Sequence, residues 1–283
     1  MATRRGYWIR QDSADSRLEC CWSQGSGKIS ACHGWASLSA MAEGLVFITG
    51  GSRGIGLALA EEAPFDPLRI IDISRHGAES SEHFAADLGN PASWSLVADL
   101  FDAEVAAFAG DCVVFIQSAG TLQPMGFAGE VDAASYARNV LLNSAAPQVL
   151  GDAFLRAVRS SEIPSHLVMI GSGAAESIYE GWTAYGAGKA AVNQWVRIAG
   201  AEQARRGDRC RIFAVAPGVV ATTMQEEIRE MPEGRFPEVA KFVELYEAGE
   251  LRDPVVVARD IWDLVLRGTA NGAVLDLRDL GDE

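Results

Sequence analysis

The segment Gly50-Gly51-Ser52-Arg53-Gly54-Ile55-Gly56 constrains the fold more than any other part of the chain. It directly follows the apolar run at residues 45–49, and a helical pattern begins within it at Ile55. Glycines in a strand-to-helix turn let the backbone bend tightly and approach a pyrophosphate, which the N–H groups of the helix N-terminus bind. A plain loop can carry the same glycines, so the prediction of a dinucleotide site depends on the pattern of the residues C-terminal to this turn.

Alternating strand and helix patterns continue to the end of the chain. The strand candidates are residues 45–49, 69–74, 112–117, 166–171, 211–216 and 274–277, and the helical candidates are residues 55–62, 92–108, 133–160, 183–206 and 254–267. Strands joined by crossover helices form right-handed βαβ units in a parallel sheet covered on both faces. We therefore expect an α/β fold, a single doubly wound Rossmann domain.

Composition limits the partners of this chain. Its 283 residues suffice for one large domain with a buried core. Acidic residues outnumber basic ones by 38 to 24, and the net charge of −14 repels nucleic acid and anionic membrane surfaces. No apolar run approaches the ~20 residues of a membrane span, and the five cysteines without framework spacing fit a reducing compartment. We expect a cytoplasmic protein with a small-molecule partner, no nucleic acid and no membrane.

Residues 1–40 differ in composition from the rest of the chain. They contain three of the five cysteines and three of the seven tryptophans, without helical or strand periodicity. We expect a disordered or dispensable extension, with the domain at residues 41–283. The potential metal ligands there lack the two-residue gaps of a zinc knuckle, so no metal is expected. These side chains are Cys20, Cys21, Cys32 and His33.

Three polar residues have spacings that suit catalysis. Tyr185 and Lys189 are four residues apart in a helical stretch, so they share one helix face. An ammonium beside a phenol lowers the phenol pKa from ~10 and makes tyrosine a usable general acid. Ser172 follows the strand at 166–171, where its hydroxyl can hydrogen-bond a substrate carbonyl. An ordinary amphipathic helix and strand end would explain the same residues without catalysis.

These motifs together resemble the short-chain dehydrogenase/reductase family over residues 41–283. The glycine segment resembles the family pattern TGxxxGxG, and Ser172, Tyr185 and Lys189 have the family's catalytic spacing. The resemblance implies hydride transfer to a carbonyl carbon while Tyr185 protonates the oxygen. It also implies that Asn143, with Asn139 as the competing candidate, holds a water linking Lys189 to solvent. Members pair through helices such as those at 133–160 and 183–206, so a homodimer is expected, with a tetramer as the alternative.

The resemblance also assigns a cofactor. Where NAD-selective members have an acid after the second strand, this chain has Ser74 and Arg75, and with Arg53 they suit a 2′-phosphate, so NADPH/NADP⁺ is expected. If the strand register is shifted by two residues, Asp72 is instead the acid that binds the ribose. Alternatively, both arginines are solvent-exposed side chains without a role in cofactor binding. Gln117 and Ser118 depart from the family's NNAG motif, so the sequence does not show how the end of this strand is held in the sheet. The other cofactor contacts implied by family motifs are Gly50, Ser52, Gly54, Ile55, Gly56, Asp87, Leu88, Ser118, Ala119, Gly120, Pro217, Gly218, Val220 and Thr222, with Tyr185 and Lys189.

Residues 222–251 and the C-terminus bear on the substrate. The segment 222–251 is long, acidic and amphipathic, and a substrate lid and a structural helical hairpin fit it equally. The runs Thr223-Met224-Gln225 and Gly272-Ala273-Val274-Leu275-Asp276 resemble the sepiapterin reductase and benzil reductase branch. This resemblance implies that Met224 contacts substrate and that Asp276 anchors it as an aspartate anchors the pterin in sepiapterin reductases. A diketone or another small aromatic ketone fits equally.

The catalytic residues and the glycine turn also bear on the alternative functions. A non-catalytic NADP(H)-sensing regulator would keep the glycine turn but lose the tyrosine, lysine or serine, all of which are present. An alcohol dehydrogenase working in the oxidative direction would use the same residues. An extended sugar-nucleotide epimerase or dehydratase resembles GxxGxxG at its first turn, which Gly50, Gly54 and Gly56 do not match. We therefore expect a carbonyl reductase. This expectation rests on the site residues, because the same fold occurs in proteins of many functions.

Overall fold

The computed structural model describes residues 42–207 and 209–280. The predicted N-terminal extension at 1–40 and its cysteines and histidine lie outside these residues. None of the helices in these two ranges is long and apolar enough to cross a membrane.

Seven parallel strands form one sheet in the order β3-β2-β1-β4-β5-β6-β7. Their bounds are β1 (Gly44–Thr49), β2 (Leu68–Ser74), β3 (Glu82–Ala85), β4 (Cys112–Gln117), β5 (Ser165–Ile170), β6 (Cys210–Ala216) and β7 (Ala273–Asp276). The sequence predicted six of these strands to within one residue at each end. It missed β3, because this short edge strand is mostly exposed and lacks an apolar run.

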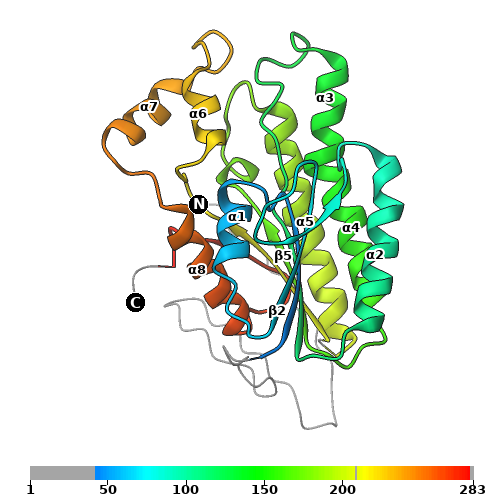
Figure 1. Ribbon diagram of the computed structural model, residues 1–283. Helices are drawn as coiled ribbons and strands as arrows, with labels where there is room; N and C mark the ends of the chain where they lie inside the picture. Colours follow the sequence, from blue (N-terminus) through cyan, green and yellow to red (C-terminus); the bar gives the residue numbers. More distant parts are fainter. Residues whose placement is uncertain (1–41, 208, 281–283) are drawn as a thin grey trace, which may run out of the picture. The chain divides into compact units, whose positions relative to one another are not determined.

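Helices cover both faces of the sheet (Figure 1). The first face packs against α1 (Gly54–Glu61) and α8 (Pro254–Leu266), and the second against α2 (Trp94–Ala107), α4 (Ala146–Val158) and α5 (Thr183–Arg205). Beyond the carboxyl edge of the sheet lie α3 (Ala133–Val140), α6 (Thr223–Arg229) and α7 (Val239–Glu247). Helices on both faces of a parallel sheet confirm the predicted architecture, and the helices beyond its edge lie where ligands bind in such folds.

The helix predicted at 133–160 is interrupted. A π-helical turn, Leu141–Ala145, separates α3 from α4. Pro147 lacks the N–H that would bond the carbonyl of Asn143 in a regular α-helix, and the widened turn lies at that position. The interruption therefore has a local cause in the sequence, and it fixes the place of Asn143.

Alternation along β1 shows how the sheet is buried on both faces. Leu45 and Phe47 belong to the apolar cluster with α2, α4 and α5, whereas Val46 and Ile48 belong to the cluster with α1 and α8. All four side chains are fully buried, as expected for a central parallel strand. A third cluster forms beyond the sheet edge and includes Tyr185 with residues of α6 and α7.

Candidate active site

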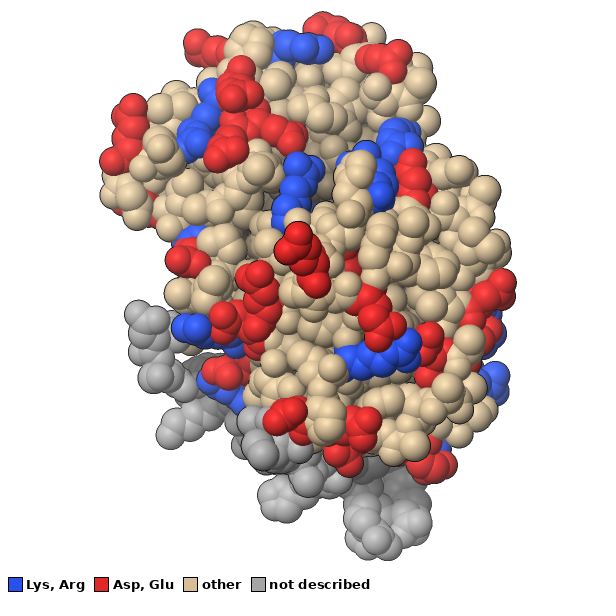
Figure 2. Space-filling model, viewed as in Figure 1, with Lys and Arg blue, Asp and Glu red and all other residues tan. Residues whose placement is uncertain are grey.

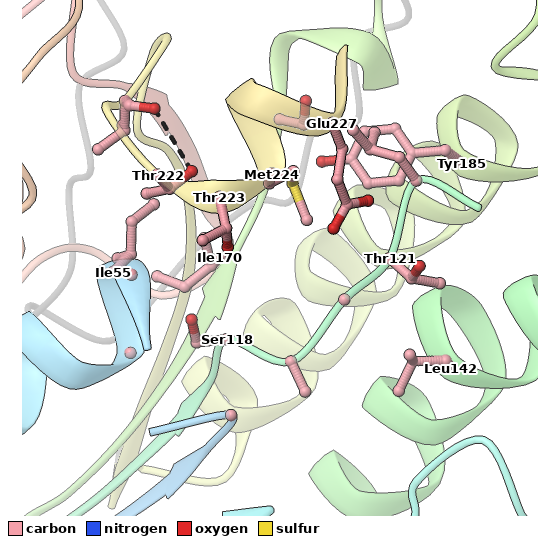
Figure 3. A pocket seen from close by; sticks show the side chains of 18 of the residues that line it. Ile55, Ser118, Thr121, Leu142, Ile170, Tyr185, Thr222, Thr223, Met224 and Glu227 are labelled. Carbon is pink, nitrogen blue, oxygen red and sulfur yellow. Dashed lines mark hydrogen bonds between the residues drawn. The ribbon is translucent and has the colours of Figure 1, made fainter. Parts of the chain in front are cut away.

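One cavity of about 840 Å³ runs along the carboxyl edge of the sheet, from the glycine segment to α6 and α7. It opens where the strand order reverses between β1 and β4, the position where doubly wound sheets bind ligands. All the site residues predicted from the sequence line it except Asn143 and Asp276. Figure 3 shows Ile55, Ser118, Tyr185, Thr222 and Met224 arranged around this space.

The glycine segment is shaped so that side chains would not fit. Gly50 has φ 69°, and a Cβ on Gly56 would lie 2.2 Å from the Gly50 carbonyl oxygen. A Cβ on Gly54, which has φ 56°, would approach Thr222 Cγ2 at 3.3 Å. The turn therefore brings bare backbone and the first N–H groups of α1 against the cavity, which suits a pyrophosphate.

The end of β2 settles the strand register. Ser74 is the last residue of β2, as predicted, and Asp72 is fully buried. The Asp72 carboxylate accepts hydrogen bonds from Gly51 N–H and the Ser74 hydroxyl, both at 2.8 Å. Asp72 thus supports the glycine turn and does not line the cavity, which removes it as a ribose ligand.

The support of β4 differs from the pattern typical of the family: Gln117 uses its amide oxygen, and its buried Nε2 has no hydrogen-bond partner among the described residues. The Thr49 hydroxyl donates to Gln117 Oε1 at 2.6 Å and accepts hydrogen bonds from the N–H groups of Ser118 and Ala119 at 3.0 and 3.1 Å. One threonine therefore joins the ends of β1 and β4, and Gln117 orients its hydroxyl. The residues at 117 and 118 therefore still join the two strand ends, through Gln117 Oε1 and the Ser118 N–H.

Asp87, another residue of the cavity wall, is held in a charged pair. Arg138 of α3 donates to both of its carboxylate oxygens, at 2.7 and 2.8 Å, and Gly89 N–H donates to one of them. These hydrogen bonds and the charge of Arg138 oppose the desolvation of Asp87 and leave its pKa below the usual value. The sequence reasoning found Asp87 and Leu88 but missed Arg138, since nothing in its spacing relates it to residue 87.

Tyr185, Ser172 and Lys189 meet at the end of β5. Burial raises the pKa of Tyr185, and a hydrogen bond to the Ser172 side chain opposes that rise. Lys189 Nζ lies 5.7 Å from the centre of the Tyr185 ring and donates to the Ile170 carbonyl at 2.7 Å. Burial lowers the pKa of Lys189 to about 8, so the side chain is still mainly an ammonium at neutral pH. The hydroxyl, the phenol and the ammonium thus lie together in the wall of the cavity.

Both candidate asparagines are buried behind this site and linked to each other. Asn143 Nδ2 donates to Asn139 Oδ1 and to the Thr121 carbonyl, both at 2.7 Å, and Asn143 Oδ1 accepts from Thr121 N–H at 3.0 Å. Asn139 donates to the carbonyls of Thr121 and Gln123. A Cβ on Gly188 would lie 3.1 Å from Asn143 Cβ, which places Asn143 against α5 next to Lys189. The pair therefore shapes the segment after β4 without lining the cavity.

The segment 222–251 folds as two helices over the cavity. Met224, Gln225 and Glu227 of α6 line it, and the third apolar cluster joins this segment to Tyr185. Within that cluster Trp182 stacks on Phe236 at 4.5 Å between ring centres. Sequence reasoning missed Trp182, although it stands three residues before Tyr185 on the helix entry.

Asp276 has a different neighbour from the one expected. It ends β7, and Arg278 donates to its two carboxylate oxygens at 2.9 and 2.6 Å. The hydrogen bonds to Arg278 hold the pKa of Asp276 below its usual value. Arg278 lines the cavity and Asp276 does not, so the carboxylate is committed to positioning a guanidinium.

Comparison with known proteins agrees with this geometry. The sequence model of the short chain dehydrogenase family matches residues 44–233. The chain is a short-chain dehydrogenase. Members use NAD(P)(H) and act on alcohol or carbonyl groups. The chain is 31% identical over 241 residues to a benzil reductase ((S)-benzoin forming) of Bacillus subtilis, covering 83% of this chain and 98% of that one.

Two further relatives place this short-chain dehydrogenase in the same branch and fold. It is 28% identical over 260 residues to the sepiapterin reductase of Bos taurus, covering 83% of this chain and 94% of the relative. The fold matches the crystal structure of a short-chain dehydrogenase/reductase from Saccharomyces cerevisiae with a TM-score of 0.71 and 24% identity, covering 82% and 95% of the two chains. The predicted family and branch are thereby confirmed.

Acidic side chains are spread over the face seen in Figure 2, with basic ones between them. No broad basic surface appears on that face. The lysines and arginines that line the cavity come from several elements; they are Arg53, Arg75, Arg138, Lys189, Lys241 and Arg278.

Proposed function

We propose that this short-chain dehydrogenase reduces a small ketone or 1,2-dicarbonyl, of the benzil or sepiapterin kind, to an alcohol with NADPH. The observation that carries the proposal is the Tyr185 phenol, hydrogen-bonded to Ser172 and backed by Lys189, at the inner end of a cavity whose other end is the glycine turn. The 31% identity to a benzil reductase over nearly its whole length supports the carbonyl as substrate.

In this proposal each polar group has one task. The nicotinamide cofactor supplies a hydride to the carbonyl carbon. Ser172 Oγ holds the carbonyl oxygen against the Tyr185 hydroxyl, and Tyr185 gives its proton to that oxygen as negative charge develops there. The Lys189 ammonium, 5.7 Å from the centre of the Tyr185 ring, stabilises the phenolate that remains. Asn143 with Asn139 keeps the segment after β4 in place beside Lys189.

The preference for NADPH rests on two arginines that line the cavity: Arg53 at the start of α1 and Arg75 directly after β2. Guanidinium groups suit the 2′-phosphate, and the buried Asp72 leaves no acid there for a ribose diol. The Ser74 hydroxyl is already bonded to Asp72 and to Gly77 N–H, so it orders this loop rather than supplying a free donor. We expect Arg53→Ala and Arg75→Ala each to lower kcat/KM for NADPH at least tenfold relative to NADH, and the surface change Arg159→Ala to leave the ratio unchanged.

Tyr185→Phe tests the mechanism. NADPH consumption at 340 nm is followed with benzil, sepiapterin and diacetyl, and the reverse reaction with the matching alcohols and NADP⁺. Wild type should consume NADPH with at least one carbonyl, and Tyr185→Phe should lose turnover by about a hundredfold or more while still binding NADPH. Tyr136→Phe on α3, outside the cavity, is the matched control. Full turnover by Tyr185→Phe would refute the mechanism, and tight NADPH binding without any turnover in wild type would favour a regulator.

Three further elements belong to the proposal. Residues 222–251 act as a substrate lid with Met224 as a contact, and Asp276 acts through Arg278, which it holds at the cavity. The chain forms a homodimer through α3, α4 and α5, which expose Val140, Val149 and Ile198; light scattering during gel filtration distinguishes this from a monomer or tetramer. A cytoplasmic location is supported by the free thiols of the two cysteines in the described part of the chain.

A further inference from the structure

The substrate half of the cavity contains a carboxylate for which the proposed reaction has no use. Glu227 lies on α6, one turn after Met224, and its carboxylate reaches into the cavity on the side where Thr121 and Tyr185 lie (Figure 3). Its side chain is partly buried, and no ion pair within residues 42–207 and 209–280 includes it. A partly buried carboxylate without a cationic partner leaves an unbalanced negative charge in the cavity.

The three cationic side chains on this side of the cavity, Lys189, Arg278 and Lys241, each have another partner. Lys189 donates to the Ile170 carbonyl at 2.7 Å and lies 5.7 Å from the centre of the Tyr185 ring. Arg278 is neutralised by Asp276, which accepts two of its N–H groups. Lys241 Nζ donates to the Tyr179 hydroxyl at 3.1 Å and lies 5.0 Å from the centre of its ring. Lys241 is exposed and Glu227 is partly buried. Water therefore screens the charge of the Lys241 ammonium more strongly than that of the Glu227 carboxylate.

The Asp276 carboxylate, which the sequence suggested as the anchor for a donor-rich substrate, is bonded to Arg278. That carboxylate comes from the end of β7 and faces a guanidinium, whereas Glu227 comes from the covering helix α6 and lines the cavity itself. Of these two acids, Glu227 is therefore the one whose oxygens remain available to a bound molecule.

We propose that Glu227 selects the substrate by charge. Its carboxylate favours carbonyl compounds that carry a positive charge or N–H donors beside the reacting group, and it disfavours carboxylates such as keto acids. The inference rests on the proposed carbonyl reduction and adds to it a residue that discriminates between substrates. Repulsion of a wrongly charged substrate gives specificity as effectively as attraction of the right one.

The test uses three forms of one substrate: benzil, benzil with a para trimethylammonium group, and benzil with a para carboxylate. We compare kcat/KM for the two charged forms in wild type, Glu227→Gln, Glu227→Lys and Glu226→Gln, at constant ionic strength. Comparing each variant with wild type cancels the intrinsic reactivity of the substrates. Glu226 is the matched control, because it lies on the same helix, is exposed and does not line the cavity.

Wild type should prefer the ammonium form over the carboxylate form. Glu227→Gln should reduce this preference about tenfold, the effect of removing one poorly screened charge, and Glu227→Lys should reverse it. Glu226→Gln should change it less than about twofold. A preference unchanged in Glu227→Gln, or changed equally by Glu226→Gln, would overturn the inference, as would a wild type that prefers the carboxylate. Turnover of unmodified benzil tests the proposed function separately, since benzil carries no charge.

Discussion

Lys189→Met is expected to make the cofactor-free protein more stable at neutral pH while abolishing turnover. Lys189 is 7% exposed, and burial lowers its pKa from 10.5 to about 8. Each pKa unit corresponds to about 1.4 kcal/mol, so the charged side chain costs the folded state about 3 kcal/mol at pH 7. Methionine removes this cost but leaves the Ile170 carbonyl without its donor, which costs about 1–2 kcal/mol. The net gain is about 1–2 kcal/mol.

The sign of the pH dependence gives the sharper test. A lysine whose folded-state pKa is depressed destabilises the fold fully below about pH 8, and the cost disappears as pH rises to 10.5. The free energy of unfolding in urea is measured for both proteins at pH 7.0 and 9.5. The stability gained by Lys189→Met over wild type should be about 2 kcal/mol smaller at pH 9.5 than at pH 7.0. The lost hydrogen bond to Ile170 costs the same at both pH values, so it does not affect this change. The exposed Lys241→Met is the control. A difference independent of pH would refute the reasoning.

Three glycine and core substitutions test the packing. Gly200→Ala, despite better helix propensity, should destabilise the protein by about 1–3 kcal/mol in urea unfolding, because the new Cβ would lie 2.1 Å from Gly272 N. Phe101→Ala should cost about 3–5 kcal/mol in the same assay, since this ring is fully buried against three other phenylalanines. Gly56→Ala should weaken NADPH binding, measured by fluorescence titration, about tenfold or more, because its Cβ would displace the Gly50 carbonyl.

The parts of the fold that the sequence predicted are those with strong periodic or turn signals. Buried strands such as β4 (Cys112–Gln117) read as continuous apolar runs, and the glycine turn marks the start of α1. The edge strand β3 was missed because its pairing with β2 comes from backbone bonds and needs no apolar side chain. The break at Leu141–Ala145 was missed because helical periodicity continues through a widened turn.

Residues of the candidate site divide in the same way. Tyr185, Lys189 and the glycine segment have a fixed local spacing, so the sequence places them. Arg138 and Glu227 reach the cavity from elements far along the chain, and only the tertiary arrangement brings them there. Their signals were an ordinary charge on a helix, which usually marks a solvated face.

The shared aromatic packing of Tyr185 and the covering helices has a consequence for attempts to redesign the enzyme. Trp182 contacts Tyr185 edge-on at 5.6 Å between ring centres and stacks on Phe236, which precedes α7. Exchanging the covering segment for that of a relative would therefore alter the wall against which the phenol is desolvated. The same side chains therefore influence both the substrate range and the pKa of Tyr185. A chimera that gains a new substrate is expected to shift its pH optimum as well.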